Sequence, residues 1–284
     1  MTIKNLLYSN IIDRQATINI GSAGHVSEGK STIVRQMTGV ATQKHKKEQE
    51  SNCTINLGYA GCKFWKDNET NELFYTGSNV KSFTNPKTNN SCQLIKHCSF
   101  VDCPGHEAYM ATMISGTSVM DCALLLVAAN SDSVPQTQTY EHLLALNNTD
   151  LNQFLILQNK IDLLKSKQDA YNNLQQIKEF LDGSIAEKSP IIPVSAQLGT
   201  NMDIIAHYLC FDMIPLSKNL NKNLRIPLIR SFDINKPKTR LDSIKGGVIG
   251  GSIRQGVLEK NQYIEIRPGI IRTIDDKEYC CPII

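Results

Sequence analysis

The sequence has no long hydrophobic run and no segment of the kind that directs secretion. Its longest apolar run, residues 122–129, is far shorter than the ~20 residues that a membrane-spanning helix needs. Residues 1–14 contain neither a long apolar stretch nor a small-residue cleavage pattern, which argues against a secretory signal. We therefore expect a cytoplasmic protein without a membrane partner.

Paired cysteines and a strong net charge are missing as well. The nine cysteines are scattered without a C-x-x-C pair, and Cys98 and Cys122 fall in strand-like segments, as reduced and buried thiols do. A disulfide framework is therefore not expected. The formal net charge of +3 is too small to indicate a nucleic-acid partner by itself. The basic run at residues 44–47 has two interpretations, a solvated loop or a contact with RNA.

The composition is that of a globular protein, with 41% hydrophobic and 20% charged residues in a chain of 284. Up to about residue 216, short apolar segments alternate with helical patterns, which predicts parallel strands joined by crossover helices. The strands are nearly continuous in apolar residues, as a sheet covered on both faces requires. We expect strands at 16–20, 98–102, 122–129, 154–158 and 191–194, and helices at 31–37, 108–116, 137–146, 170–181 and 201–210.

The expected fold class is a doubly wound α/β domain at residues 15–216, after an N-terminal extension at 1–14. Residues 63–96 are rich in Asn, Thr and Ser and lack strong periodicity, which predicts a surface insertion. After a polar linker at 217–223, short apolar segments with glycine turns indicate a β-barrel domain at 224–284. Its strands are expected at 225–229, 246–253 and 262–266. Because the sequence stops after one more strand start, we expect this barrel to be truncated.

Residues 24–31 fit the pattern G-x-x-x-x-G-K-[ST] between an expected strand and an expected helix. Strand, glycine-rich turn and helix start direct backbone N–H groups at one point, where the phosphates of a nucleotide are favoured. Lys30 is expected to reach the terminal phosphates and Ser31 to bind Mg²⁺. This loop alone leaves ATP and GTP open. Its expected nucleotide contacts are Gly24, Val26, Ser27, Glu28, Gly29, Lys30, Ser31 and Thr32.

Two further segments complete a magnesium site. Asp102, in the run Asp102-Cys103-Pro104-Gly105, ends an apolar strand, where its carboxylate can hold Mg²⁺ through water while the Gly105 N–H faces the γ-phosphate. Thr54 follows the first helix and can add a hydroxyl when its loop closes. The expected metal ligands are therefore Ser31, Thr54 and Asp102.

A third group of residues predicts a guanine site. In Asn159-Lys160-Ile161-Asp162, the Asp162 carboxylate can accept two N–H bonds from guanine, the Lys160 stem covers the ring and Asn159 braces the loop. Adenine lacks this pair of donors and would leave a buried carboxylate unpaired. Backbone N–H groups of Ser195, Ala196 and Gln197, after the last strand, can meet guanine O6. The predicted nucleotides are GTP and GDP. The expected base-side contacts are Asn159, Lys160, Ile161, Asp162, Ser195, Ala196 and Gln197.

His106 follows the metal-side Asp–Gly pair directly and is the candidate catalytic residue. A histidine at this place can orient and polarise the water that attacks the γ-phosphate. The other interpretation is a surface histidine at a helix start. Val26 could act as an apolar gate between His106 and that water.

In this order, the motifs resemble those of the translational GTPases, the family that contains elongation factor Tu. The similarity narrows to the gamma subunits of eukaryotic and archaeal translation initiation factor two. It implies a P-loop GTPase domain followed by a partial β-barrel domain. The segments that carry the narrower similarity are residues 52–60, 110–113, 155–163, 190–197, 229–237 and 245–253.

That resemblance implies a GTP-binding subunit that carries methionyl initiator tRNA to the small ribosomal subunit, with GTP hydrolysis as the release switch. Its implied partners are alpha and beta subunits, a GTPase-activating factor and a nucleotide-exchange factor. Two departures matter. Glu28 stands where the family commonly has a second histidine, which brings a negative charge near the phosphates unless the side chain points away. The insertion offers only Cys62 and Cys92 where relatives carry a zinc knuckle, so no structural zinc is expected.

Three alternatives stay open at this point. The first is a GTP-binding scaffold with little or no hydrolysis. The second is a relative that delivers an elongator or selenocysteine tRNA, against which residues 57–60 and 247–253 argue. The third is an ATP-dependent P-loop enzyme, against which Asp162 argues.

Overall fold

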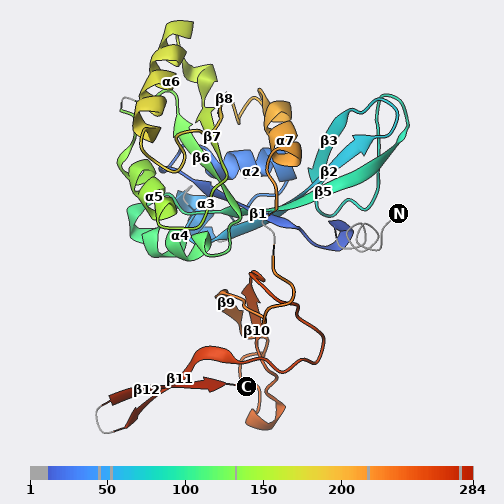
Figure 1. Cartoon of the computed structure of the whole chain (residues 1–284), viewed down its shortest axis with the longest axis vertical. Helices are drawn as coiled ribbons and strands as arrows, with labels where there is room; N and C mark the ends of the chain where they lie inside the picture. The colour runs from blue at the N-terminus through green and yellow to red at the C-terminus, as the bar shows by residue number, and fades with distance from the viewer. Residues whose placement is uncertain are drawn as a thin grey trace. The chain divides into compact units, whose positions relative to one another are not determined.

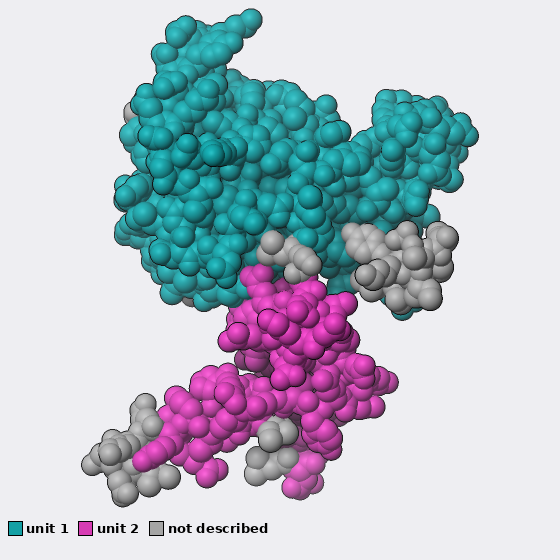
Figure 2. All heavy atoms as spheres, in the orientation of Figure 1, with its two compact units in different colours: residues 1–216 teal, residues 217–284 magenta. Residues whose placement is uncertain are grey.

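The computed structural model describes residues 12–43, 46–51, 54–131, 133–215, 218–274 and 277–283. The chain forms two compact units, Met1–Leu216 and Ser217–Ile284 (Figure 2). The N-terminal extension up to residue 11 and the start of the basic run, Lys44 and His45, lie outside the described residues.

A single mixed sheet organises the first unit, with strand order β3-β2-β5-β1-β6-β7-β8 and β4 paired to β5 (Figure 1). The five strands from β5 to β8 in this order are parallel to their neighbours. Their carboxyl ends therefore meet at one edge of the sheet, where ligands of open α/β folds bind. These strands are β1 (Ile18–Ala23), β5 (Ser91–Asp102), β6 (Cys122–Ala128), β7 (Phe154–Asn159) and β8 (Ile191–Pro193).

Helices cover both faces of the parallel strands, as their sequences predict. Every residue of β6 and β7 is buried, which explains why these strands show no apolar–polar alternation. A core cluster packs side chains of the sheet, such as Phe100 and Leu124, with side chains of α2 and α7. The helices are α2 (Lys30–Thr38), α3 (Lys46–Ser51), α4 (Met110–Thr117), α5 (Thr137–Asn147), α6 (Lys167–Leu181) and α7 (Met202–Phe211), with short 3₁₀ turns η1 (Glu107–Tyr109) and η2 (Ile161–Leu163).

The stretch at residues 63–96 differs from the aperiodic insertion expected for it, because most of it is antiparallel sheet. It contains the second half of β2 (Gly58–Asp67), all of β3 (Leu73–Gly77) and β4 (Phe83–Thr84), and the first half of β5. β2 pairs with β5 along its whole length, from Gly58 opposite Asp102 to Asp67 opposite Cys92. The extension is thus continuous with the main sheet.

Asp67 explains why this stretch has the composition of a loop. Its buried carboxylate accepts hydrogen bonds from the Glu69 N–H at 2.8 Å, the Thr70 N–H at 3.1 Å and Asn85 Nδ2 at 2.6 Å. Asn90 Nδ2 also lies 3.4 Å from it. Three polar side chains of this stretch, those of Asn85, Thr88 and Asn90, therefore bond one buried acid at the turns between strands.

The two cysteines of this extension lie far apart. Cys62 is opposite Cys98, whereas Cys92 is opposite Asp67, five residues further along β2. At ~3.4 Å per residue this separation is about 17 Å. Cys62 and Cys92 are therefore too distant to bind one metal ion.

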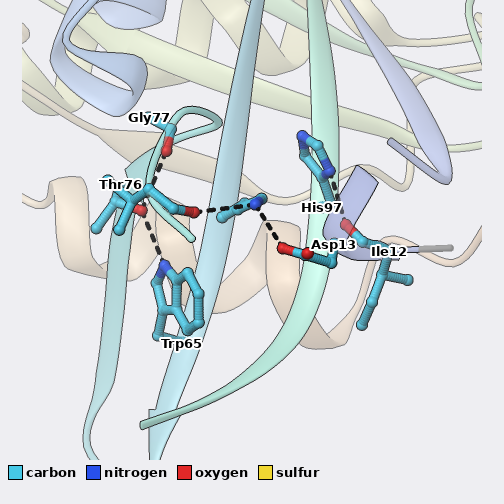
Figure 3. A network of polar contacts seen from close by, with 8 residues as sticks. Ile12, Asp13, Trp65, Thr76, Gly77 and His97 are labelled. Atoms are coloured by element: carbon cyan, nitrogen blue, oxygen red, sulfur yellow. Dashed lines mark hydrogen bonds and ion pairs between the residues drawn. The ribbon is translucent and has the colours of Figure 1, made fainter. Parts of the chain in front are cut away.

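The segment before β1 is fastened to the same extension (Figure 3). Lys63, whose side chain is 2% exposed, donates from Nζ to Asp13 Oδ1 at 2.9 Å and to the Val80 carbonyl at 2.9 Å. His97 Nδ1 lies 2.8 Å from the Ile12 carbonyl, to which it must donate because a carbonyl only accepts. Burial lowers the pKa of His97, so this ring is neutral near pH 7 and carries its proton on Nδ1.

The second unit is built of two antiparallel ribbons. β9 (Leu228–Phe232) pairs with β10 (Val248–Gly251), and β11 (Ile266–Ile274) pairs with β12 (Lys277–Ile283). Apolar side chains such as Phe232 and Ile271 are 47% and 57% exposed. The prediction of a strand at residues 262–266 is wrong, because β11 begins only at Ile266. Residues before it form a turn in which Gln262 N–H donates to the Glu259 carbonyl at 3.3 Å.

None of the helices within the described ranges is both long and apolar enough to cross a membrane.

Candidate functional site

The phosphate loop connects β1 to α2 and needs two glycines for its shape. β1 ends at Ala23 and α2 begins at Lys30. Gly24 has φ 140° and Gly29 has φ 97°, values that side chains with a Cβ rarely adopt. The loop borders a cavity of about 220 Å³ lined by Val26, Ser27, Gly29, Lys30, Ser31, Thr32, Gln43, Thr54 and Gly105. Eight of the nine lining residues are predicted site residues.

Lys30 supports the loop as well as facing the cavity. Its side chain is buried, and Nζ donates to the Gly24 carbonyl at 2.9 Å and to the His25 carbonyl at 2.7 Å. Gly105 packs against the same group, because a Cβ added at Gly105 would lie 3.0 Å from the Gly24 carbonyl oxygen. The ammonium group is thereby fixed at the place where terminal phosphates are expected.

The two predicted hydroxyl ligands of the metal lie together. Ser31 Oγ and Thr54 Oγ1 are 3.1 Å apart, and Gln43 Nε2 donates to Thr54 Oγ1 at 3.4 Å. Neighbouring ligands of an octahedral Mg²⁺ at ~2.1 Å are separated by about 3.0 Å. The hydroxyl pair therefore fits the coordination geometry of Mg²⁺. Sequence reasoning missed Gln43, which has no motif to mark it.

Asp102, the third predicted ligand, is fully buried at the end of β5. Its Oδ1 accepts from Ser22 Oγ at 3.0 Å and its Oδ2 from Thr42 Oγ1 at 2.5 Å. Both partners escaped sequence analysis, although a serine inside the buried strand β1 is a usable signal. These hydroxyls orient the carboxylate as partners of a metal-ligating acid commonly do.

On the base side, Asn159 ties the phosphate loop to the segment after β8. Its Nδ2 donates to the Glu28 carbonyl at 2.7 Å, and its Oδ1 accepts from the Ala196 N–H at 3.0 Å. The Ala196 N–H, expected to meet guanine O6, is therefore used by Asn159 in this structure. Its neighbour Ser195 is buried and Gln197 is exposed.

The other base-side residues stand at the surface of the same edge. Lys160 has a left-handed backbone with φ 63° and is half-buried. Ile161 and Asp162 follow in η2, and the Asp162 side chain is exposed. The acceptor for guanine is thus accessible from solvent.

Glu28 does not line the cavity. Only 1% of the residue is exposed, and its carboxyl oxygens lie 3.0 and 3.1 Å from Thr139 Oγ1 of α5, which donates to them. Burial raises the pKa of Glu28 to about 7. The Glu28 side chain therefore turns away from the phosphates, and its prediction as a nucleotide contact is corrected for the side chain.

His106 lies beside the loop but points to solvent. It is exposed and caps η1, where its Nδ1 accepts from the Ala108 N–H at 3.2 Å. Its ring centroid is 6.0 Å from that of Tyr109. Val26, the predicted gate, is half-buried and does line the cavity.

Comparison with known proteins identifies a family and relatives of this chain. Residues 15–235 match the model of the elongation factor Tu GTP binding domain. The chain is 46% identical over 283 residues to eukaryotic translation initiation factor 2 subunit 3 of Drosophila melanogaster, covering 97% of this chain and 59% of that protein. It is 46% identical over 284 residues to the gamma subunit of eukaryotic translation initiation factor 2 of Schizosaccharomyces pombe, covering 97% and 63%. The chain thus spans about three fifths of these relatives.

Two solved structures have the same fold. The bacterial selenocysteine-specific elongation factor superposes with a TM-score of 0.62 at 22% identity, over 90% of this chain and 36% of that one. Elongation factor SelB from Methanococcus maripaludis, in complex with the GTP analogue GppNHp, gives 0.63 at 20% identity, over 93% and 49%. At these identities the likeness concerns the fold alone. Because the family match spans every segment that lines the cavity, the chain belongs to the family of the elongation factor Tu GTP binding domain, the translational GTPases.

Proposed function

We propose that this chain binds GTP and GDP with Mg²⁺ and hydrolyses GTP as the GTP-binding subunit of a translation initiation factor. The observation that carries the proposal is the Ser31–Thr54 hydroxyl pair, 3.1 Å apart, in the cavity that Lys30 also lines. A phosphate loop supplies the first hydroxyl, and a segment 23 residues away supplies the second. Such convergence favours a metal–triphosphate ligand over a simple anion.

The residues of the chain divide the work of phosphate transfer. Lys30 and the backbone around Gly29 bind the phosphates, while Ser31, Thr54 and Asp102 hold the metal. Bound Mg²⁺ supplies charge neutralisation on the phosphate oxygens. On the base side, Asp162 accepts two hydrogen bonds from guanine, and the Lys160 stem covers its ring.

His106 is proposed to position the attacking water. To do so its ring must leave the cap of η1, where it accepts from the Ala108 N–H. That bond is a single neutral hydrogen bond at an exposed site, worth ~1 kcal/mol. The rotation is therefore inexpensive, and Val26, which lines the cavity, is the proposed gate between His106 and the water.

The partners follow from the relatives, both of which are subunits of eukaryotic translation initiation factor 2 by name. We propose that the chain works with alpha and beta subunits and carries methionyl initiator tRNA to the small ribosomal subunit in the cytoplasm. Hydrolysis, stimulated by a GTPase-activating factor, would release the tRNA, and a nucleotide-exchange factor would restore GTP.

The test of this function measures nucleotide and tRNA binding together. The chain, with the alpha and beta subunits present, is titrated with methionylated initiator tRNA and with elongator methionine tRNA in GTP or GDP. We expect GTP to raise the affinity for the initiator tRNA selectively. Equal affinities for both tRNAs in both nucleotides would contradict the delivery role.

A GTP-binding scaffold with little hydrolysis is the second candidate. The exposed, capping position of His106 favours it. GTP turnover measured with and without small ribosomal subunits distinguishes the two, because only the delivery factor shows stimulated phosphate release.

A further inference from the structure

The backbone N–H and carbonyl groups of Gly24 and His25, at the start of the phosphate loop, are all held by side chains. The carbonyls of Gly24 and His25 accept from Lys30. The Gly24 N–H donates to His142 Nδ1 at 2.9 Å, and the His25 N–H donates to Glu28 Oε2 and to Thr139 Oγ1 at 3.1 Å. Each group is therefore satisfied, as buried backbone requires.

Helix α5 supplies two of these side chains from one face. Thr139 and His142 are three residues apart, so they project on the same side of the helix. Both are completely buried. Since His142 Nδ1 accepts a hydrogen bond from the Gly24 N–H, the proton of the neutral ring must be on Nε2, which has no hydrogen-bond partner in the part of the chain described. Burial lowers the pKa of His142 to about 3, so it remains a neutral acceptor around pH 7.

Glu28 is the unusual member of this group. A buried carboxyl group costs free energy unless it is hydrogen-bonded. Here the His25 N–H donates to it, the Thr139 hydroxyl lies within hydrogen-bond distance of both its oxygens, and the Ala128 backbone adds a further hydrogen bond. Its side chain reaches across 111 residues of sequence to α5. It connects the loop to the body of the domain without touching the cavity.

We propose that Glu28 is a positioning residue that, with Thr139 and His142, locks the first turn of the phosphate loop onto helix α5 and thereby sets how long nucleotide stays bound. This inference rests on the proposed binding of GTP and GDP. A loop held in its binding conformation loses less entropy when the ligand binds. Changes of this kind act mainly on dissociation rates.

The buried carboxyl group of Glu28 also makes nucleotide binding depend on pH. Phosphates near the loop disfavour the charged carboxylate, so binding favours the protonated form of Glu28. The groups that interact with Glu28 are Lys30 and the His25 N–H from the loop, Thr139 from α5 and the Ala128 backbone from β6, and Asn159 donates to its backbone carbonyl. Burial lowers the pKa of both His25 and His142, whereas it raises the pKa of Glu28 to about 7. Affinity is therefore expected to rise as pH falls from 8 to 6.

The kinetic test follows release of a fluorescent GDP analogue from the full chain. Glu28→Ala and Thr139→Val should each speed release by roughly tenfold, the loss expected for one buried hydrogen bond. The double variant should release the analogue more slowly than two independent effects would predict, because both changes break one hydrogen-bond network and their effects on the logarithm of the rate do not add in full. Glu28→Gln, which keeps an acceptor for the His25 N–H, should release within about threefold of the original rate and lose the pH dependence. Glu141→Gln, on the same helix outside the network, is the matched control.

A second measurement does not depend on nucleotide. Amide hydrogen exchange of Gly24 and His25 in the nucleotide-free chain should accelerate in Glu28→Ala and Thr139→Val but not in Glu141→Gln. If the original chain binds no guanine nucleotide, the proposed function fails while this measurement still decides the locking role. Unchanged exchange and unchanged release in Glu28→Ala, or a pH dependence that survives Glu28→Gln, would overturn the inference. If the Glu28→Ala chain does not fold, the pH dependence of release in Glu28→Gln decides whether the inference holds.

Discussion

On the phosphate side of the site, Lys30, Thr54 and Glu28 are each at most 6% exposed, whereas on the base side Asp162 and Gln197 are exposed. The difference follows from charge. A triphosphate and a metal demand fixed groups in a water-poor setting, where electrostatic interactions are strongest. A guanine base needs a hydrogen-bond acceptor that it can reach from solvent. Asn159 joins the two sides, because its amide contacts both the Glu28 carbonyl and the Ala196 N–H.

The largest expected effect comes from removing the His106 side chain, which is proposed to position the attacking water on the phosphate side. His106→Ala should slow GTP hydrolysis by ~10²–10⁴-fold, the usual contribution of general acid–base groups, while GTP affinity stays nearly intact. The affinity should persist because His106 is exposed and does not line the cavity. Single-turnover phosphate release and equilibrium titration measure the two effects. Glu107→Ala, next to it in η1, is the control, and equal hydrolysis by His106→Ala and the original chain would sink the assignment.

A smaller effect is expected on the base side. Asp162→Asn should lower GTP affinity by ~10²-fold, because a charge-assisted pair of hydrogen bonds is lost. Xanthosine triphosphate should bind the variant better than GTP does, since xanthine offers one donor and one acceptor that match the amide. The change should leave hydrolysis of bound nucleotide unaffected, which sharpens the division between the two sides. Competition titration with GTP, ATP and xanthosine triphosphate checks it, and an unaltered preference for GTP would refute the role of Asp162.

Sequence reasoning succeeded where local pattern and spatial role coincide. The phosphate loop is one continuous segment between an apolar strand and a helix, and the parallel strands β6 and β7 are buried on both faces throughout. Their sequences therefore contain the signal directly. Lys30 and Ser31 from this loop line the cavity, as does Thr54 from a separate segment, and their roles toward nucleotide and metal stay predictions.

It failed where one residue organises others from a distance. Asn and Thr residues at 63–96 suggest a loop, yet Asn85 and Asn90 serve the buried Asp67 between strands. Thr139 and His142 bear no motif, because their role depends on contacts with residues 111 and 118 positions away. Such pairings are set by tertiary packing, which a local sequence pattern does not contain.

The last expected effect concerns the pH dependence of folding stability and is specific to the buried Glu28. Burial raises the pKa of Glu28 from 4.5 to about 7, so between these values the folded chain binds a proton that the unfolded chain has released. The stability contributed by the protonated group is therefore present near pH 4.5 and is lost as pH rises to 7. The loss amounts to about 3 kcal/mol, because each pH unit of this window costs about 1.4 kcal/mol.

Glu28→Gln removes the titrating group, so its free energy of unfolding should fall less between pH 5 and pH 8 than that of the original chain. Urea titrations at several pH values measure this difference, and Glu141→Gln should follow the original profile. Parallel profiles for Glu28→Gln and the original chain would mean that the carboxyl group is ionised throughout. The phosphate loop would then carry a permanent negative charge at its back, and the contrast between a buried phosphate side and an accessible base side would need a different electrostatic explanation.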